Sequence, residues 1–507
     1  MPLPHTVRTL KQVCLRNISK NMDRLWSADF DRLFADMPRL YYVLGPFDYM
    51  TSEMLQELLD TLCADHRVRR SHLHLLLTGR LKELDFSKCS NMTSMLHLVG
   101  IRCQKLTKLD LSNCSVATQT VLCSIFQSLP LLSWLNLRQT KTNDQVLTTI
   151  LSSCKKLQHL NLFACPVTDR GIANIFQELQ NGNGASNMKQ KSNCIASGAS
   201  LKYLNISATK ISSKGAIMIL NMCPNLHVLL YADVIDAVAQ TCNSGDNEDT
   251  LKLRTLNASA LKCREVSPES VQLAVLRCPF VTEINFYQNA NDSTLQYLKE
   301  LKHLNTLEIT SDQWGDVTFF DGLKPLFTSI GPNIRSLGLY DIKDLDIGQL
   351  GVLCPNLRRL KCVMAVFNSV AFIDTPLSGK DLKSIYRDLD NLMVVIGNDS
   401  TNFSASMFEQ ILENATSLSE LHLINVQCMC TDLLLCILEK HGMQSLSSLT
   451  LESCNRLSGD AISRLICCEN PLRALCLRNC QDTSQQDVDG FRKYVKKHNL
   501  QLSIVWE

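Results

Sequence analysis

From residue 81 onward, leucines recur in a pattern that alternates apolar and polar positions over a short stretch. The spacing Leu-x-x-Leu-x-Leu, or a close variant of it, begins at Leu81, Leu106, Leu132, Leu157 and Leu201. Alternation of this kind is typical of a β-strand with one buried face, and each copy then passes through a turn into a stretch of helical periodicity. The pattern therefore predicts a strand, a turn and a helix in each unit.

The length of the unit indicates that the units stack on one another. Successive starts lie about 25 residues apart, apart from one longer step, and single units of this length cannot bury their own leucine face. Stacked units share one continuous core, so we expect a curved α/β solenoid with parallel strands on the concave face and helices on the convex face. Looser and then clean copies bring the total to about fifteen units, starting at Leu226, Leu253, Val281, Leu304, Ile334, Leu357, Leu392, Leu418, Leu446 and Leu472.

Many copies end in cysteine, as in LDFSKC, LDLSNC and LCLRNC, at Cys89, Cys114 and Cys480. Over most of residues 81–480 the copies resemble the cysteine-containing subclass of leucine-rich repeats. The resemblance implies the fold and leaves the function open, because many unrelated binding proteins use this scaffold.

The spacing also suggests how the chain is organised. The longer step contains the polar run Gln180–Ser200, which we expect to be a flexible loop inserted into the solenoid at about 180–200, and a shorter acidic loop follows at Asn243–Thr250. Residues 1–70 contain no repeat, so we divide the chain into a helical N-terminal segment, 1–70, and a solenoid, 71–507.

The N-terminal segment begins with an amphipathic helix. Val7, Leu10, Cys14, Ile18 and Met22 follow one another at helical spacing, so we expect them to form one apolar stripe that must be buried against something. One reading is that residues 7–70 only cap the open end of the first repeat, as every solenoid requires.

A second reading comes from the segment TLKQVCLRNI. It resembles the elongin C-binding box of VHL-box and SOCS-box proteins, with Thr9, Leu10, Cys14 and Ile18 at the four box positions. The resemblance implies that the helix docks in a groove of elongin C, which brings elongin B with it. Leu10 would be the anchor, and Cys14 is small enough to allow close approach one turn on.

In that family a cullin-contacting segment follows the box, and Met37, Pro38 and Leu40 could supply it. The cullin-5 type of motif, Leu-Pro-x-Pro, is absent, which favours cullin-2. A box followed by leucine-rich repeats resembles the Zyg-type substrate receptors of cullin-2 ubiquitin ligases, although the armadillo-like repeats usual in those relatives are missing here.

Two groups of side chains stand at strand positions that should face solvent. Trp134, His159, Phe163 and Tyr203 are predicted to form an aromatic patch across neighbouring repeats, because exposed aromatic clusters often anchor a protein partner. Farther along, Arg358 and Arg359, together with Arg335 and Lys361, would suit an acidic peptide. Packing beneath the insertion and a solvated charge run are the respective alternatives.

Composition narrows the classes of function. A formal charge of +2 leaves no electrostatic footprint for nucleic acid, and no apolar run is long enough to span a membrane. No phosphate loop, catalytic motif or zinc spacing is present, so we expect no enzyme, no cofactor and no bound metal. Most of the 23 cysteines fall at repeated positions, which favours buried thiols in the cytoplasm or nucleus over disulfides.

The leading hypothesis is a substrate-recognition subunit of an elongin-cullin-RING ubiquitin ligase. Its first helix would bind elongin C, with cullin-2 and a RING subunit beyond, and the concave face would hold a protein substrate. The alternative is a leucine-rich-repeat scaffold whose N-terminal helices only cap the solenoid, and a third possibility is an inhibitor that clasps one enzyme.

Overall fold

The structure is a computed structural model that divides the chain into two compact units. One is built from residues of Arg8–Leu253 and the other from residues of Arg254–Glu507. Nothing in the repeat spacing indicates a division at this point. The residues that the structure describes are 9–28, 46–64, 68–87, 96–114, 118–174, 196–242, 250–258, 266–287, 290–311, 317–364, 385–397, 404–440, 443–468 and 470–507.

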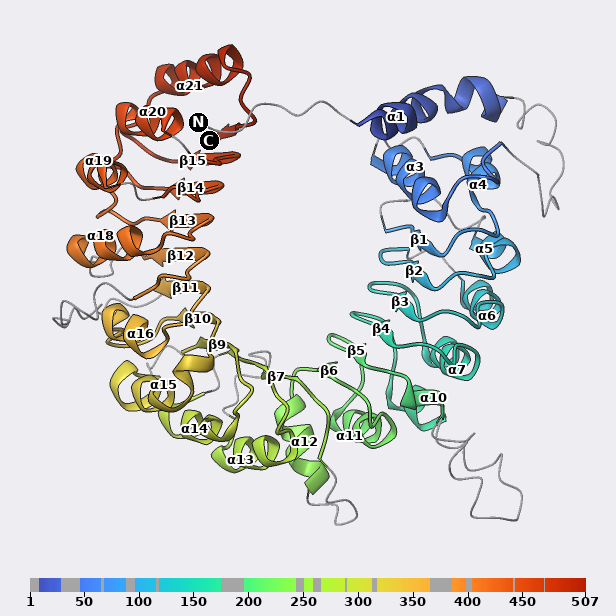
Figure 1. The fold of residues 1–507 in the computed structure, drawn as a ribbon. Helices are drawn as coiled ribbons and strands as arrows, with labels where there is room; N and C mark the ends of the chain where they lie inside the picture. Colours follow the sequence, from blue (N-terminus) through green and yellow to red (C-terminus); the bar gives the residue numbers. More distant parts are fainter. Residues whose placement is uncertain are drawn as a thin grey trace. The chain divides into compact units, whose positions relative to one another are not determined.

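In the N-terminal unit, six described strands pair in parallel, each with the next along the chain, and helices cover one side of the sheet (Figure 1). We call the side of the sheet away from these helices the strand face. The elements are α1 (Leu10–Met22), the π-helical turn η1 (Asp23–Ser27), α3 (Ser52–Ala64), α4 (Arg70–Leu76), β1 (Glu83–Asp85), α5 (Leu96–Arg102), β2 (Lys108–Asp110), α6 (Gln119–Gln127), β3 (Trp134–Asn136), α7 (Asp144–Ser153), β4 (His159–Asn161), α10 (Ala196–Ala199), β5 (Tyr203–Asn205), α11 (Ser213–Met222), β6 (Val228–Leu230) and α12 (Val234–Cys242).

The C-terminal unit repeats this arrangement with ten described strands, again all parallel and paired in chain order. Its elements are β7 (Thr255–Ala258), α13 (Pro268–Arg277), β8 (Glu283–Tyr287), α14 (Asp292–Gln296), η3 (Tyr297–Glu300), β9 (Thr306–Thr310), η4 (Phe319–Leu323), α15 (Lys324–Ile330), η5 (Gly331–Asn333), β10 (Ser336–Tyr340), α16 (Ile347–Leu353), β11 (Arg359–Met364), β12 (Asn391–Ile396), α18 (Ala405–Asn414), β13 (Glu420–Ile424), α19 (Thr431–Glu439), β14 (Ser448–Glu452), α20 (Gly459–Cys467), β15 (Ala474–Arg478), α21 (Gln485–Lys497) and β16 (Ser503–Trp506).

The repeat leucines form the core, which confirms the predicted class of parallel strands backed by helices. In the third repeat Leu132, Leu135 and Leu137 are all fully buried. Two details of the predicted pattern were wrong. The twelfth repeat begins at Leu389 and not at Leu392, because β12 takes the same register as its neighbours. The last strand, β16, was missed because its segment lacks the full leucine spacing.

A contact that recurs between neighbouring repeats explains a feature of the sequence, a glycine three or four residues after a threonine. The carboxylate of Asp144, at the start of α7, accepts hydrogen bonds from the backbone N–H and the hydroxyl of Thr168 in the next repeat, both at 2.7 Å. A Cβ at Gly171 would lie only 2.7 Å from Asp144 Oδ1. Asp292 binds Thr318 in the same way in the other unit, at 2.9 and 2.8 Å. Glycine therefore leaves room for the aspartate that joins two repeats.

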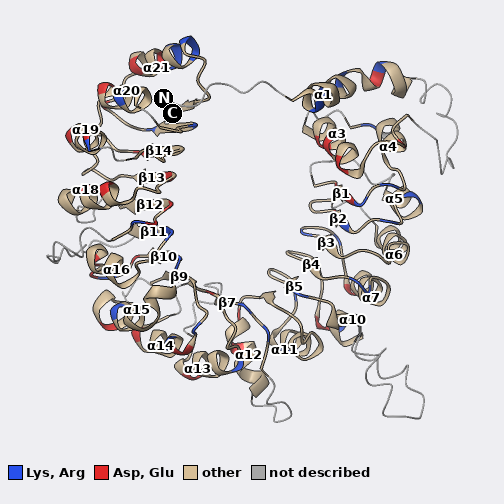
Figure 2. Ribbon diagram, in the orientation of Figure 1, with Lys and Arg blue, Asp and Glu red and all other residues tan. Residues whose placement is uncertain are grey.

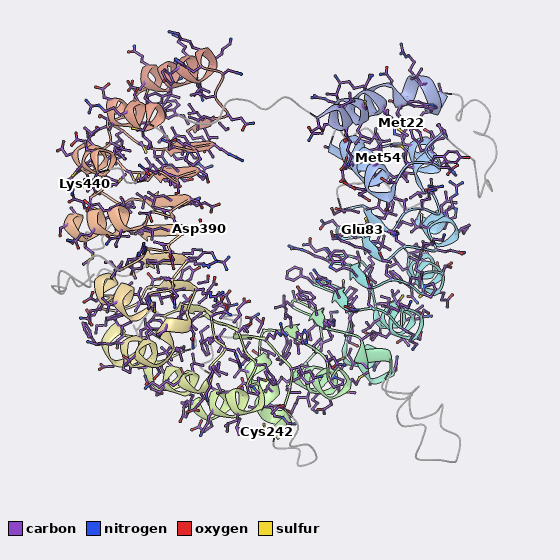
Figure 3. All side chains as sticks on the ribbon, viewed as in Figure 1. Met22, Met54, Glu83, Cys242, Asp390 and Lys440 are labelled. Atoms are coloured by element: carbon purple, nitrogen blue, oxygen red, sulfur yellow. The ribbon has the colours of Figure 1, made fainter. Side chains whose placement is uncertain are left out.

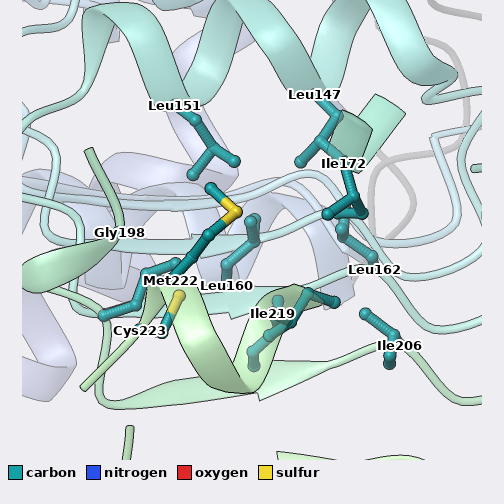
Figure 4. Close-up of a pocket in the computed structure, with 12 residues that line it drawn as sticks. Leu147, Leu151, Leu160, Leu162, Ile172, Gly198, Ile206, Ile219, Met222 and Cys223 are labelled. Carbon is teal, nitrogen blue, oxygen red and sulfur yellow. The ribbon is translucent and has the colours of Figure 1, made fainter. Parts of the chain in front are cut away.

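The predicted insertion lies mostly outside the described residues, which resume at 196. Its last part, Ala196–Ala199, forms the short helix α10, so this end of the predicted loop is helical. Next to it, an apolar cavity lies between strands β4 and β5 and helices α7 and α11 (Figure 4). Because Leu160, Ile219 and most of the other lining residues belong to the repeat core, this cavity is a gap in packing where the regular step is interrupted.

The cysteines mostly behave as the pattern predicts. Nineteen described cysteines are free thiols, and the turn cysteine Cys165 donates its thiol to the carbonyl oxygen of Leu137 in the preceding repeat, at 3.0 Å. Burial raises the pKa of the Cys154 and Cys223 thiols to about 12, which keeps them protonated and unreactive. Cys63 on α3 is an exception to the pattern expected of most cysteines, because it is disulfide-bonded.

None of the helices in the described ranges is both long enough and apolar enough to cross a bilayer.

Candidate functional site

The predicted box lies on a well-defined helix. Thr9 is the N-cap of α1, and its hydroxyl accepts a hydrogen bond from the Gln12 backbone N–H while the Gln12 side chain accepts one from the Thr9 N–H. This reciprocal capping fixes the start of the helix at Leu10. The first box position is therefore the cap, and the other three, Leu10, Cys14 and Ile18, lie on the helix itself.

Helix α1 has two different faces. Leu15, Ser19 and Met22 are buried on its inner face, which packs on α3, and Figure 3 marks Met22 near the end of the helix. Lys11 adds ion pairs to Glu53 and Glu57 of α3, at 3.0 and 2.8 Å, and these bonds raise the pKa of the Lys11 amine. The inner face attaches the helix to the unit.

The outer side of α1 carries exposed apolar residues near its start. Leu10 has 79% of its surface exposed, and Val13 and Cys14 beside it are also exposed. The predicted stripe is therefore not buried as a whole within the chain itself. Met22 points inward, Ile18 is half-buried and Leu10 and Cys14 point outward, because α3 meets the helix along Leu15 and Met22, roughly a third of a turn away.

The edge of the first strand is sealed by α3 and not by α1. The Lys82 N–H donates to Ser52 Oγ at 2.9 Å, and the Asp85 N–H donates to Gln56 Oε1 at 3.2 Å. Both acceptors are on α3, whose other face buries Leu58 and neighbouring leucines. These bonds satisfy backbone donors that an open sheet edge would leave exposed.

The remaining N-terminal elements are held by polar contacts. His72 of α4 is fully buried, with its Nε2 atom 2.8 Å from Asp23 Oδ1. Met37, Pro38 and Leu40, the predicted cullin-contacting residues, lie outside the described residues, so their placement stays a prediction.

On the strand face of the N-terminal unit, three of the four predicted aromatic residues form a continuous stack. Trp134, His159 and Tyr203 occupy matching positions on β3, β4 and β5. The Trp134 and His159 ring centroids are 4.9 Å apart, and the His159 and Tyr203 rings are nearly parallel at 3.9 Å. The stack arises because parallel strands in register place equivalent side chains side by side.

Charged residues continue this row toward the first repeat. Lys108 on β2 lies 5.1 Å from the Trp134 ring centroid, and its amine is 3.6 Å from Glu83 Oε2 on β1. Figure 3 marks Glu83 at this end of the row. Both faces of the His159 ring are covered by its neighbours, so this ring presents only its edge to a partner.

Burial lowers the pKa of the His159 imidazole to about 4, so the ring is neutral at physiological pH. Its Nδ1 atom is buried without a hydrogen-bond partner among the described residues. The fourth predicted residue, Phe163, lies outside the stack and packs instead beneath the Arg138 guanidinium, whose carbon is 4.6 Å from the Phe163 ring centroid.

The predicted basic residues belong to the C-terminal unit. Arg359 is the first residue of β11, and Arg358 precedes it; both are exposed. The aromatic stack and these arginines thus lie in different units, and each must be considered as a separate surface.

The repeat architecture and a sequence match agree. A family model for the leucine-rich repeats of FBD-associated F-box protein At5g56370 matches residues 70–182. The chain is a leucine-rich-repeat protein.

Solved structures with similarity to this leucine-rich-repeat protein include a chain of the Rad7 and Elc1 complex from yeast, with 13% identity, a TM-score of 0.41 and coverage of 95% of this chain and 96% of that chain. An internalin from Listeria monocytogenes shows 15% identity and a TM-score of 0.38, and the match covers 75% of this chain and 97% of that chain. The protein LIC12759 from Leptospira interrogans shows 14% identity and a TM-score of 0.33, and the match covers 94% of this chain and 97% of that chain. At these TM-scores none of them bears on function. No curated protein matches the chain.

Sequence reasoning missed two features of this leucine-rich-repeat protein. Val13 and Leu25 add to the apolar surface on the outer side of the N-terminal helices, although neither fits the box spacing. A row of Asp and Asn side chains runs beside the aromatic stack, in which Asn136 Nδ2 donates to Asp110 Oδ2 at 2.9 Å. The recurring Asp or Asn after the second leucine was the available signal. No group of three metal-ligating side chains occurs in the described parts of the chain.

Proposed function

We propose that this chain is a noncatalytic substrate receptor of an elongin-cullin-RING ubiquitin ligase, acting in the cytoplasm or nucleus. The leucine-rich-repeat units provide a scaffold for protein interaction. Helix α1 binds elongin C, which brings elongin B, and cullin-2 with a RING subunit completes the ligase. Thr9, Leu10, Cys14 and Ile18 are the docking residues of the box.

The observation that carries this proposal is the outward direction of the box. A helix that served only as a cap would turn its apolar side chains toward the solenoid, yet Leu10 and Cys14 face solvent while a different set of residues attaches the helix. Since α3 already covers the strand edge, the outer face of α1 has no role in sealing the sheet. An exposed leucine beside a small residue on a rigid helix suits insertion into an apolar groove.

Side chains on the strand face of the N-terminal unit support the proposed binding of a protein substrate. Trp134, His159 and Tyr203 form a preorganised, half-buried aromatic row, and large rigid side chains of this kind often contribute most to a protein interface. Because the rings stack on one another, they lose little conformational freedom when a substrate packs against their edges. We assign this row, with Phe163 beside it, to substrate binding.

The test is co-expression of the full chain with elongin B and elongin C, followed by purification through a tag on this chain. We expect all three to elute as one complex. Leu10→Ala removes the anchor, and losing a fully buried leucine costs about 2 to 5 kcal/mol, enough to release a micromolar partner. Cys14→Phe should release the elongins for a different reason, because the larger side chain prevents close approach.

Arg16→Ala is the matched control, since Arg16 is exposed on the same helix but points away from the box side chains. This variant should retain both elongins. If the unmodified chain retains no elongin C, or if Leu10→Ala and Cys14→Phe retain as much as Arg16→Ala, the N-terminal helices are only a cap. The chain would then be a leucine-rich-repeat scaffold without a ligase role.

A further inference from the structure

Four cations gather at the beginnings of β10 and β11 in the C-terminal unit, where Figure 2 shows Lys and Arg. The backbone N–H groups of Arg358 and Arg359 both donate to the carbonyl oxygen of Arg335, at 2.8 and 3.0 Å. The three arginines are therefore direct neighbours across two strands. Lys361 lies on the same face of β11 as Arg359, because alternate residues of a strand point to the same side. We call these four residues the basic cluster.

Within the described residues, no ion pair neutralises the arginines of the basic cluster. Arg335, Arg358 and Arg359 are exposed, and in the described residues none of them forms an ion pair. Lys361 lies over the Tyr340 ring, 5.0 Å from its centroid, and this contact directs the amine without cancelling its charge.

Two other strand-face cations are paired, whereas some exposed cations at the strand position of Arg335 and Arg358 form no ion pair among the described residues, namely Lys82, Lys202, Arg254 and Arg473. In the N-terminal unit Lys108 pairs with Glu83, and farther along the C-terminal unit Arg478 pairs with Glu507 at 2.9 Å. The basic cluster differs from these isolated cations because Arg358 and Arg359 directly adjoin Arg335 on the neighbouring strand.

Carboxylates near the basic cluster have other partners or lie on flanking strands. Asp390, marked in Figure 3, accepts a hydrogen bond from Ser419, and Glu420 on β13 accepts one from Asn391. On the other side, Glu308 stands on β9, two strands from β11. These carboxylates bound the cluster on both sides and would repel an anion placed off its centre.

We propose that the basic cluster binds an acidic segment of a partner protein. Guanidinium groups hold carboxylates and phosphates through paired hydrogen bonds, so the recognised chemistry is an anionic oxygen group repeated along an extended chain, either Asp and Glu or phosphoserine. A nucleic acid is disfavoured because the protein has a formal charge of only +2 and no wider basic field. This inference rests on the proposed function only in calling the bound segment a substrate.

The experiment measures fluorescence anisotropy of labelled peptides with the full chain. The probes are a peptide of alternating Glu and Ser, the same peptide with Gln for Glu, and one with phosphoserine at the Ser positions and Gln for Glu. We expect the Glu peptide to bind at least about tenfold more tightly than the Gln peptide, and to weaken as salt is raised through physiological ionic strength. The phosphoserine probe distinguishes phosphate from carboxylate as the preferred anion, and tighter binding by either one supports the proposal.

The double variant Arg358→Glu/Arg359→Glu should weaken the anionic peptides by about tenfold or more. Lys493→Glu/Lys496→Glu is the matched control, because it makes the same change of net charge at exposed positions of α21. The control should change binding by less than about twofold. Circular dichroism and thermal melting should show both variants folded, so that a loss of binding reports on the surface.

Three outcomes would overturn the proposal: equal binding of the Glu and Gln peptides, equal losses in the two double variants, or tighter binding of a single-stranded oligonucleotide at the basic cluster. The test is separable from that of the ligase role. The Arg358→Glu/Arg359→Glu chain should still retain elongin C, and the Leu10→Ala chain should still bind the Glu peptide.

Discussion

Leu10 and Leu15 lie five residues apart on α1 and differ sharply in environment. Leu10 has 79% of its surface exposed, whereas Leu15 has 5%. The same truncation to alanine at these two positions should therefore have opposite consequences. Leu15→Ala should loosen the helix and Leu10→Ala should leave it in place.

The magnitudes follow from burial. Leu15 packs at the α1–α3 contact, which joins a single pair of helices, so we expect its truncation to cost about 2 to 3 kcal/mol, the low end for a buried leucine. Leu10 makes few contacts in the free chain, and alanine is a better helix former, so Leu10→Ala should stay within about 0.5 kcal/mol of the unmodified chain.

Hydrogen exchange of the α1 backbone measures this difference locally, without requiring two-state unfolding of the whole chain. Leu15→Ala should lower the protection of α1 amides by about 30- to 150-fold, which corresponds to about 2 to 3 kcal/mol. Leu10→Ala should leave protection nearly unchanged. In the same preparations, the affinity for elongin C should fall for Leu10→Ala although its helix stays folded.

Equal loss of protection in the two variants would refute this reasoning, because it would mean that Leu10 packs against the protein and is not available to a partner. Unchanged protection in Leu15→Ala would refute the assignment of the inner face. The exposed Arg16→Ala variant again provides the reference for a substitution that touches neither face.

Cys14 and Cys467 are both exposed, so N-ethylmaleimide should label both thiols in the free chain. Bound elongin C should protect Cys14 and leave Cys467 reactive. Equal labelling of Cys14 with and without elongin C would contradict docking. The folded imidazole of His159 has a pKa of about 4, below its ordinary 6.5, so it contributes stability above pH 6.5 that is lost as pH falls toward 4. His159→Phe should reduce the fall in urea midpoint between pH 7 and pH 5, and an unchanged pH dependence would argue against a neutral, desolvated ring. Gly171→Ala forces a Cβ to within 2.7 Å of Asp144 Oδ1, and should lower the free energy of unfolding by about 1 to 3 kcal/mol; a neutral result in thermal melting would show that the aspartate can shift.

Leucine spacing alone was sufficient to predict the strands, their parallel order and the buried positions from Leu81 to Leu472. This succeeds because each repeat buries its leucines only against the next copy, so the period in the chain and the period in space are the same. The aromatic row followed from the same logic, since equivalent positions of successive repeats become neighbours in the sheet. Failures came where the period is imperfect, at Leu389 and at β16.

Helical spacing of Leu10, Cys14, Ile18 and Met22 predicted that α1 is amphipathic, but it could not say which side is buried. Leu15 lies at helical spacing from Lys11 and Ser19, on a different side of the helix. Which of the two sides is buried depends on where α3 lies. That position is set by hydrogen bonds that the backbone N–H groups of Lys82 and Asp85, at the edge of β1, donate to Ser52 Oγ and Gln56 Oε1, and these bonds join residues about thirty positions apart.

The sequence also could not predict which charged side chains form ion pairs. Lys108 and Lys361 both stand at strand positions that alternate with buried leucine or cysteine, yet Lys108 contacts a glutamate on the preceding strand and Lys361 contacts a tyrosine. A repeat pattern determines which side chains face solvent, because that depends on alternation along one strand. Which of them are neutralised depends on the register of adjacent strands and the reach of each side chain, and these only the folded chain decides.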